Sequence, residues 1–209
     1  VETAFGSFSH DKHDFTLVDL PGTYSLCPNS AEEEVTRDFI CFDEHDLTVV
    51  VLDATCLERN LNLALQVMMS DKKTVLCVNL MDEAKKKGIE IDLSALSKML
   101  SAPVVAVTAR SGIGMDQLIE KINNVAVSDE QAVSEYDYAE FFSTDSTALY
   151  DELKAVVDDH RLCLELIRAA NDNDYMIIER FVGEERASKV SGVLHYDEAR
   201  LKNAKDELI

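Results

Sequence analysis

The stretch Thr74-Val75-Leu76-Cys77-Val78-Asn79-Leu80-Met81-Asp82 decides the fold. Its apolar run is typical of a buried β-strand, and it ends directly in a polar Asn-x-x-Asp tetrapeptide. Strand and helix patterns alternate outward from it: strand Leu47–Asp53 and helix Leu57–Met69 before it, then helix Leu93–Leu100, strand Pro103–Thr108 and helix Met115–Val125 after it. This alternation predicts an α/β fold, a doubly wound and mostly parallel sheet with helices on both faces. We expect the strand Leu47–Asp53, with its three consecutive valines, to be covered on both faces.

The beginning of the chain has a different pattern. Residues 1–9 and Phe15–Asp19 are two strand-type runs around a polar turn at His10–Asp14, which predicts an antiparallel hairpin. Ser30-Ala31-Glu32-Glu33 is a capping-box pattern and predicts a helix that runs to about Phe42.

The alternation stops near residue 125. We expect residues 1–125 to form the α/β domain, residues 126–138 an acidic linker and residues 139–209 an all-helical domain. In that last part the apolar residues recur at helical spacing, in the groups Leu149, Leu153, Val156 and Val157, then Leu162, Leu164, Leu166 and Ile167, then Met176, Ile177, Ile178, Phe181 and Val182.

Composition excludes several classes of protein. Forty acidic and twenty basic residues among 209 give a net charge of −20, which would repel nucleic acid, so we expect no nucleic-acid partner. The five cysteines are scattered without a Cys-x-x-Cys pair, which indicates a reducing compartment and neither a disulfide framework nor a zinc ribbon. The longest strongly apolar run, Leu47–Leu52, is far shorter than the roughly 18–20 residues that cross a bilayer.

Three short motifs follow three of the predicted strands, at the sheet edge where open parallel sheets bind ligands. The first, Asp19-Leu20-Pro21-Gly22, is a D-x-x-G in which a carboxylate can hold a Mg²⁺-bound water and a glycine N–H can approach a phosphate. Alone, this motif is more often a turn at the end of a strand.

The second motif is Asn79-Leu80-Met81-Asp82. A carboxylate here can accept hydrogen bonds from N1–H and the 2-amino group of guanine, a pair of donors that adenine lacks. The chain holds two further N-x-x-D matches, Asn171–Asp174 and Asn203–Asp206, but both lie in polar, helical surroundings. Only the first match follows a buried strand.

The third motif is the small-residue loop Thr108-Ala109-Arg110-Ser111-Gly112-Ile113-Gly114. Its backbone N–H groups can reach the guanine O6, although a simple turn before a helix is equally consistent with the loop alone.

The order and spacing of the three motifs resemble a small GTPase domain of the phosphate-loop type that lacks its beginning. Sixty positions separate Asp19 from Asn79, and twenty-nine separate Asn79 from Thr108. Within the GTPases, the chain resembles the cytosolic part of the ferrous iron transport protein B family, through the runs Val18-Asp-Leu-Pro-Gly-Thr-Tyr-Ser-Leu26, Asn79-Leu-Met-Asp-Glu-Ala-Lys85 and Ser111-Gly-Ile-Gly-Met-Asp-Gln-Leu118. The helical part resembles that family's helical domain more loosely.

The resemblance implies a GTP-binding and GTP-hydrolysing domain that regulates Fe²⁺ uptake. Asp19 would support Mg²⁺ through water, and Gly22 and Thr23 would sense the phosphate and move the segment Thr23–Glu34 as the second switch. Asn79, Asp82, Thr108 and Ala109 would bind the base of GTP or GDP. The resemblance also implies a membrane permease portion in the same polypeptide, a possible small regulatory partner protein, and a place on the cytoplasmic side of the bacterial inner membrane.

Three departures from the GTPase pattern bear on activity. No G-x-x-x-x-G-K-[ST] phosphate loop occurs in the sequence. We therefore expect that roughly 35–40 upstream residues, including the first and central strand of the sheet, precede Val1 in the intact protein. Leu80 replaces the usual lysine of the base motif, which keeps apolar cover on the base but loses the charge. Thr23 stands where many GTPases have a glutamine that orients the attacking water, so we expect slow intrinsic hydrolysis.

Two alternatives remain open. A pseudo-GTPase would use the same fold as a protein-interaction module without hydrolysis, and the sequence upstream of Val1 would decide between the two. A GTPase of the translation or RNA-processing type is disfavoured by the acidic charge. The pair His10 and His13 and the acidic run Glu32–Glu34 could suggest a metal, but a solvated turn and a helix N-terminus explain them better.

Overall fold

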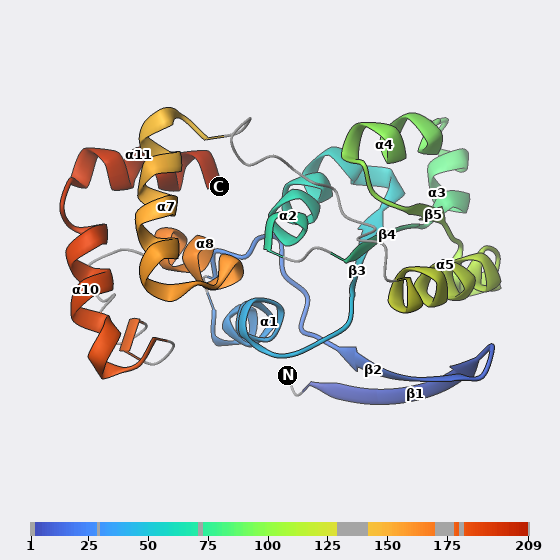
Figure 1. The fold of residues 1–209 in the computed structure, drawn as a ribbon. Coiled ribbons are helices and arrows are strands. Elements are labelled where there is room, and N and C mark those ends of the chain that lie inside the picture. Colours follow the sequence, from blue (N-terminus) through green and yellow to red (C-terminus); the bar gives the residue numbers. More distant parts are fainter. Residues whose placement is uncertain are drawn as a thin grey trace. The chain divides into compact units, whose positions relative to one another are not determined.

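The computed structural model describes residues 3–28, 30–70, 73–128, 142–169, 178–179 and 182–208. The chain forms two compact units, Val1–Glu135 and Tyr136–Ile209. Figure 1 shows strands together with helices in the first unit and helices in the second. Each unit is described by itself.

The first unit is built on a parallel sheet of three strands, β3 (Thr48–Asp53), β4 (Thr74–Asn79) and β5 (Val104–Ala106), in the order β3-β4-β5. Side chains alternate between the faces of a strand. On one face, apolar residues of β4, of β5 and of the position just after β5 pack with those of helix α5 (Met115–Val127) in a buried cluster: Val75, Cys77, Val105, Val107, Leu118, Ile122 and Val125. Helix α2 (Leu57–Ser70) contacts β3 and β4, and α4 (Leu93–Leu100) contacts β5. In Figure 1, α2 and α4 lie across the sheet from α5, so the predicted doubly wound α/β class is confirmed.

One expectation about the sheet is wrong. The strand that we expected to be covered on both faces leaves Val51 with 61% of its surface exposed. The reason is position: β3 is an edge strand of this sheet, and the buried cluster beside α5 takes in Val49 of β3 as a partly buried neighbour but not Val51. The run of valines therefore predicted the strand correctly, but not that part of one face of this edge strand is left uncovered.

The predicted hairpin is present. Strands β1 (Ala4–His10) and β2 (His13–Asp19) pair antiparallel around Asp11 and Lys12. Both turn residues have positive φ, 47° and 71°, as a tight two-residue hairpin turn requires. The hairpin is attached to the rest of the unit through α5, because Phe15 packs on the buried cluster and His13 Nδ1 hydrogen-bonds Asn123 Oδ1 at 3.0 Å.

Shorter elements complete the first unit. Helix α1 (Ala31–Phe42) begins where the capping box predicted, with the Ser30 hydroxyl accepting from the Glu33 N–H. The turns η1 (Ala54–Cys56) and η2 (Ala109–Ser111) follow β3 and β5. Helix α3 (Met81–Lys86) was not predicted, because six residues are too few to show a helical period.

The second unit is helical throughout its described residues. It contains α7 (Thr144–Val157), α8 (His160–Ala169), α10 (Glu184–Leu194) and α11 (Glu198–Leu208), and α7 contacts the other three. The predicted all-α fold class of this part of the chain is thus confirmed. Burial raises the pKa of Tyr150 and of the Cys163 thiol to about 12 each, so both groups stay neutral.

Two sequence predictions fall largely outside the described residues. Helix α5 runs to Val127, and residues 129–141, which include most of the expected linker 126–138, are not among those described. The same holds for most of the apolar group from Met176 to Val182. Among the helices that are described, none combines the length and the apolar character needed to cross a bilayer.

Gly114 generates a test of how the third motif is packed. It has φ of 83° at the start of α5, and a Cβ there would lie 2.2 Å from the carbonyl oxygen of Ala106. Gly112, in the same loop, has φ of 73° but open space around it. We expect Gly114→Ala to lower the free energy of unfolding by about 3 kcal/mol or more, and Gly112→Ala by only about 1 kcal/mol, the left-handed cost alone. Urea unfolding of both variants measures the difference, and equal losses would contradict the packing.

Candidate guanine-nucleotide site

The site lies at the carboxyl end of the parallel sheet. Residues Asp53 and Asn79 end β3 and β4 in direct register, and the loop after β5 begins beside them. Because parallel strands end at one edge, residues that are far apart in the sequence meet here.

The Asn79 side chain joins two of the three motifs. Its Oδ1 accepts hydrogen bonds from the backbone N–H of Leu80 at 2.8 Å and of Ala109 at 3.1 Å. The Val107 N–H also donates to Val78 O at 2.8 Å. The structure therefore brings the N-x-x-D motif and the Thr108–Gly114 loop together as one surface.

Asp82 lies in the first turn of α3 with its side chain 38% exposed. Its Oδ2 lies 3.9 Å from Lys86 Nζ, whose side chain is also exposed. Leu80, just before this helix, has a left-handed backbone with φ of 63° and an exposed fraction of 37%. A carboxylate available to a ligand and an apolar side chain next to it are what binding of a purine base requires.

The third motif is shaped by backbone hydrogen bonds. Thr108 is buried, and its N–H donates to Ile113 O at 2.9 Å, which closes the loop. This closure ends the regular strand at Ala106, two residues earlier than the sequence predicted. Ala109 is exposed and lies beside Asn79.

The D-x-x-G motif follows the antiparallel hairpin. Asp19 is the last residue of β2, and both Asp19 and Gly22 are exposed. A Cβ at Gly22 would meet nothing within 4 Å, so this conformation does not itself require glycine. Among the described residues, no hydrogen bond or ion pair joins Asp19, Gly22 or Thr23 to the base-motif residues.

The sequence analysis missed Asp53. Its carboxylate accepts from the Thr55 N–H at 2.7 Å, a bond that lowers the pKa of Asp53, while its own N–H donates to Asn60 Oδ1 at 2.7 Å. An acid at the end of a buried strand was the available signal, but without a recognisable motif it received no role.

The exposed Asp19 carboxylate is compatible with Mg²⁺, which commonly takes one or two protein carboxylates and otherwise water and phosphate oxygens. Within the described part of the chain, no group of three or more histidine, cysteine or acidic side chains could hold a metal by itself. A separate cavity of about 610 Å³ lies between the start of α2 and α4, and none of the predicted site residues lines it.

Known proteins match the chain closely. The profile of the family described as ferrous iron transport protein B matches residues 1–122. The Fe(2+) transporter FeoB of Campylobacter jejuni is 43% identical over 122 residues, which are 58% of this chain and 20% of that relative, so the chain spans about a fifth of the relative's length. The solved FeoB G-domain from Methanococcus jannaschii is 42% identical, with a TM-score of 0.59, and the match covers 61% of this chain and 81% of that one. The cytosolic domain of T. maritima FeoB in its GMPPNP form is 25% identical, with a TM-score of 0.72, over 100% of this chain and 82% of that one.

The bond between Asn79 and Ala109 generates a second prediction. Asn79→Ala removes the acceptor, so we expect the Ala109 amide to exchange about fivefold faster and the unit to lose about 1 kcal/mol of stability. Asn79→Asp keeps an oxygen acceptor at the same position and should preserve most of the protection. Amide hydrogen exchange of the two variants measures this, and an unchanged Ala109 amide in Asn79→Ala would show that the bond does not hold the loops together.

Proposed function

The chain belongs to the ferrous iron transport protein B family, and we propose that it binds and hydrolyses GTP as the regulatory part of a ferrous iron transporter. The single observation that carries the proposal is the Asn79–Ala109 hydrogen bond, because it unites the two loops that would recognise the base. The cytosolic domain of T. maritima FeoB, solved in a GMPPNP form, supports a guanine nucleotide as the ligand.

Recognition of the base follows from hydrogen-bond chemistry. The Asp82 carboxylate accepts from N1–H and the 2-amino group of guanine, and the loop that begins at Thr108 and Ala109 offers N–H groups to O6. Leu80 covers a face of the ring with apolar surface. Adenine has a donor at position 6 and none at N1, so it would meet both loops with the wrong polarity.

The phosphates would lie toward the D-x-x-G motif. Asp19 would hold Mg²⁺ through a water, and Gly22 would donate its N–H to the γ-phosphate. Bound Mg²⁺ would offset the phosphate charge during attack by water. Thr23 stands in place of the glutamine that orients the attacking water in many GTPases, so the rate of hydrolysis would be low without an activator.

In the full-length protein, residues 1–125 would be the GTPase domain and residues 139–209 a helical domain. Residues 126–138 would link the two domains, and a membrane permease portion would follow the helical domain. GTP and GDP states would then control Fe²⁺ uptake from the cytoplasmic side of the bacterial inner membrane. We also propose that a small regulatory protein binds the full-length transporter.

Asp82 provides the direct test. In the full-length natural protein, we expect Asp82→Ala to weaken GDP and GTP binding about 100-fold, the equivalent of about 3 kcal/mol for the lost charge-assisted bonds. Asp82→Asn places an amide donor opposite position 2 of the base, so it should bind xanthosine diphosphate better than GDP. Titration calorimetry with GDP, xanthosine diphosphate and ADP measures these preferences.

The chain supplies its own matched control. Asn203 and Asp206 form the same N-x-x-D pattern on α11, where Asp206→Ala should leave nucleotide binding unchanged. Competition by ADP equal to that by GDP would overturn the base assignment. Tight GTP binding without any turnover, with or without added membranes, would favour the pseudo-GTPase instead.

A further inference from the structure

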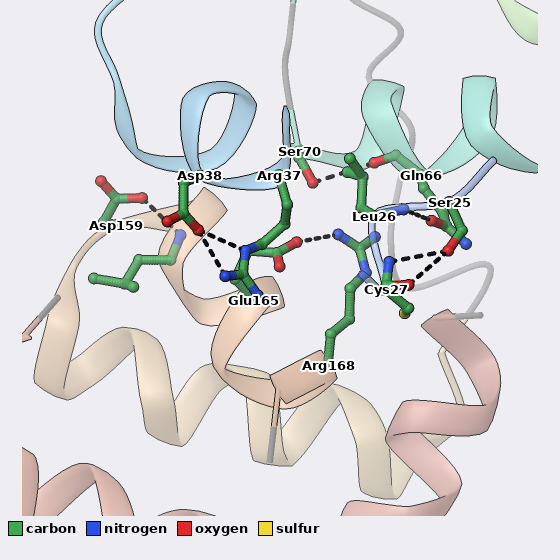
Figure 2. Close-up of polar contacts among 11 residues, drawn as sticks. Ser25, Leu26, Cys27, Arg37, Asp38, Gln66, Ser70, Asp159, Glu165 and Arg168 are labelled. Carbon is green, nitrogen blue, oxygen red and sulfur yellow. Dashed lines mark hydrogen bonds and ion pairs between the residues drawn. The ribbon is translucent and has the colours of Figure 1, made fainter. Parts of the chain in front are cut away.

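The segment that follows the D-x-x-G glycine is fixed at two buried points. At one end, the Thr36 hydroxyl of α1 donates to the Pro21 carbonyl at 2.7 Å, and both residues are buried. At the other end, the Leu26 N–H donates to Gln66 Oε1 of α2 at 2.6 Å. Leu26 and Gln66 are 1% and 2% exposed, and Figure 2 shows the bond.

Breaking either bond would leave a buried polar group without its partner, at a cost of about 1–3 kcal/mol each. Leu26 would also lose its apolar burial if it left its position. Pro21 and Leu26 are therefore the fixed ends of this part of the chain.

Between these ends, Gly22–Ser25 forms a short arch on the surface. Its internal hydrogen bonds are local, such as that from the Thr23 hydroxyl to Ser25 O at 2.6 Å. Outside the arch, the Thr23 hydroxyl lies 3.4 Å from Glu33 Oε1 of α1, and the Ser25 hydroxyl donates to the neighbouring Cys27 O at 3.2 Å. The contact with α2 is made by Tyr24, whose ring lies 4.1 Å from the Arg59 guanidinium. Because Tyr24 is 63% exposed, this cation–π contact is worth only about 0.5–1 kcal/mol.

We propose that Arg59 is a positioning residue that holds the arch Gly22–Ser25 in its resting position, and that within the D-x-x-G segment switching moves this arch alone. The proposal rests on the proposed function, since the arch carries the phosphate-sensing Gly22 and Thr23. It narrows the moving segment from Thr23–Glu34, the range that the family resemblance implies, to four residues.

Helix α1 stays in place on this account. Ile40 and Cys41 are buried, and Thr36 anchors the helix to Pro21, so a movement of α1 would break several buried contacts at once. A weak exposed contact at Arg59 and strong buried contacts at both ends give the arch a small, defined range of movement. Loss of the Arg59 contact should raise the released population about twofold to fivefold.

The sequence contains no tryptophan, so Tyr24→Trp creates a single fluorescent reporter that keeps an aromatic ring over Arg59. In the nucleotide-free chain, we expect adding Arg59→Ala to shift the emission of the introduced indole to longer wavelength and to raise its quenching by acrylamide about twofold. Arg186→Ala, at an exposed arginine of α10, is the matched control and should change neither signal. Unchanged indole emission after Arg59→Ala would overturn the proposal.

Amide hydrogen exchange defines the limits of the movement. In Arg59→Ala with the natural Tyr24, the Thr23, Tyr24 and Ser25 amides should exchange faster, while the Leu26 amide and those of α1 keep their protection. Gln66→Ala should instead expose the Leu26 amide. Loss of protection across α1 in Arg59→Ala would show that a larger segment moves and would overturn the four-residue limit.

In the full-length natural protein, the emission that Tyr24→Trp adds over the same protein with Tyr24 should shift, on addition of a non-hydrolysable GTP analogue, toward the value measured with Arg59→Ala. Bound nucleotide with no shift in this emission would refute the arch as the switch. Absence of nucleotide binding would refute the proposed function, and it would leave the nucleotide-free measurements on Arg59 as they are.

Discussion

The hydrogen bond from the Ala109 N–H to the Asn79 side chain is the interaction on which the site depends. Parallel strands place the ends of β4 and β5 at one sheet edge, but strand pairing alone would leave the two following loops independent of each other. The Asn79 amide oxygen accepts from both loops, so it converts two turns into one surface with a defined geometry. The partly exposed Asp82 and Leu80 lie directly after Asn79, where the left-handed backbone at Leu80 starts helix α3.

Most of the fold was predictable because buried elements leave periodic patterns in the sequence. The strand Thr74–Asn79 and the helix Leu93–Leu100 occupy the predicted residues, and the Ser30 capping box marks the start of α1. The spacing of apolar residues does not show which strands lie at the edge of a sheet, so the exposure of Val51 could not be predicted from it. Helix α3 was not predicted because its six residues are too few to show a helical spacing of apolar side chains.

The candidate site was predictable only where a motif existed. The N-x-x-D pattern and the loop at Thr108 could be paired because both follow apolar strands, and the structure places them in contact. Asp53 occupies the same edge in register with Asn79, yet its role is local: it caps the turn that starts α2. Contacts made by Arg59 and Gln66 depend on how α2 lies against a loop more than thirty residues away in the sequence, and no local pattern encodes that.

The two kinds of contact on the D-x-x-G segment differ in a way that suits a switch. A segment without anchors would lose conformational entropy each time it bound a phosphate, whereas a segment buried along its whole length could not respond to one. Buried bonds at Pro21 and Leu26 restrict the free part of the chain to four residues, which keeps the entropy loss on binding small. The exposed Tyr24–Arg59 contact then sets a resting state that a ligand can displace for about 1 kcal/mol, less than one charge-assisted hydrogen bond to a phosphate supplies. A ligand that makes one such bond to the Gly22 N–H only in the moved position would therefore have enough differential affinity to shift the arch.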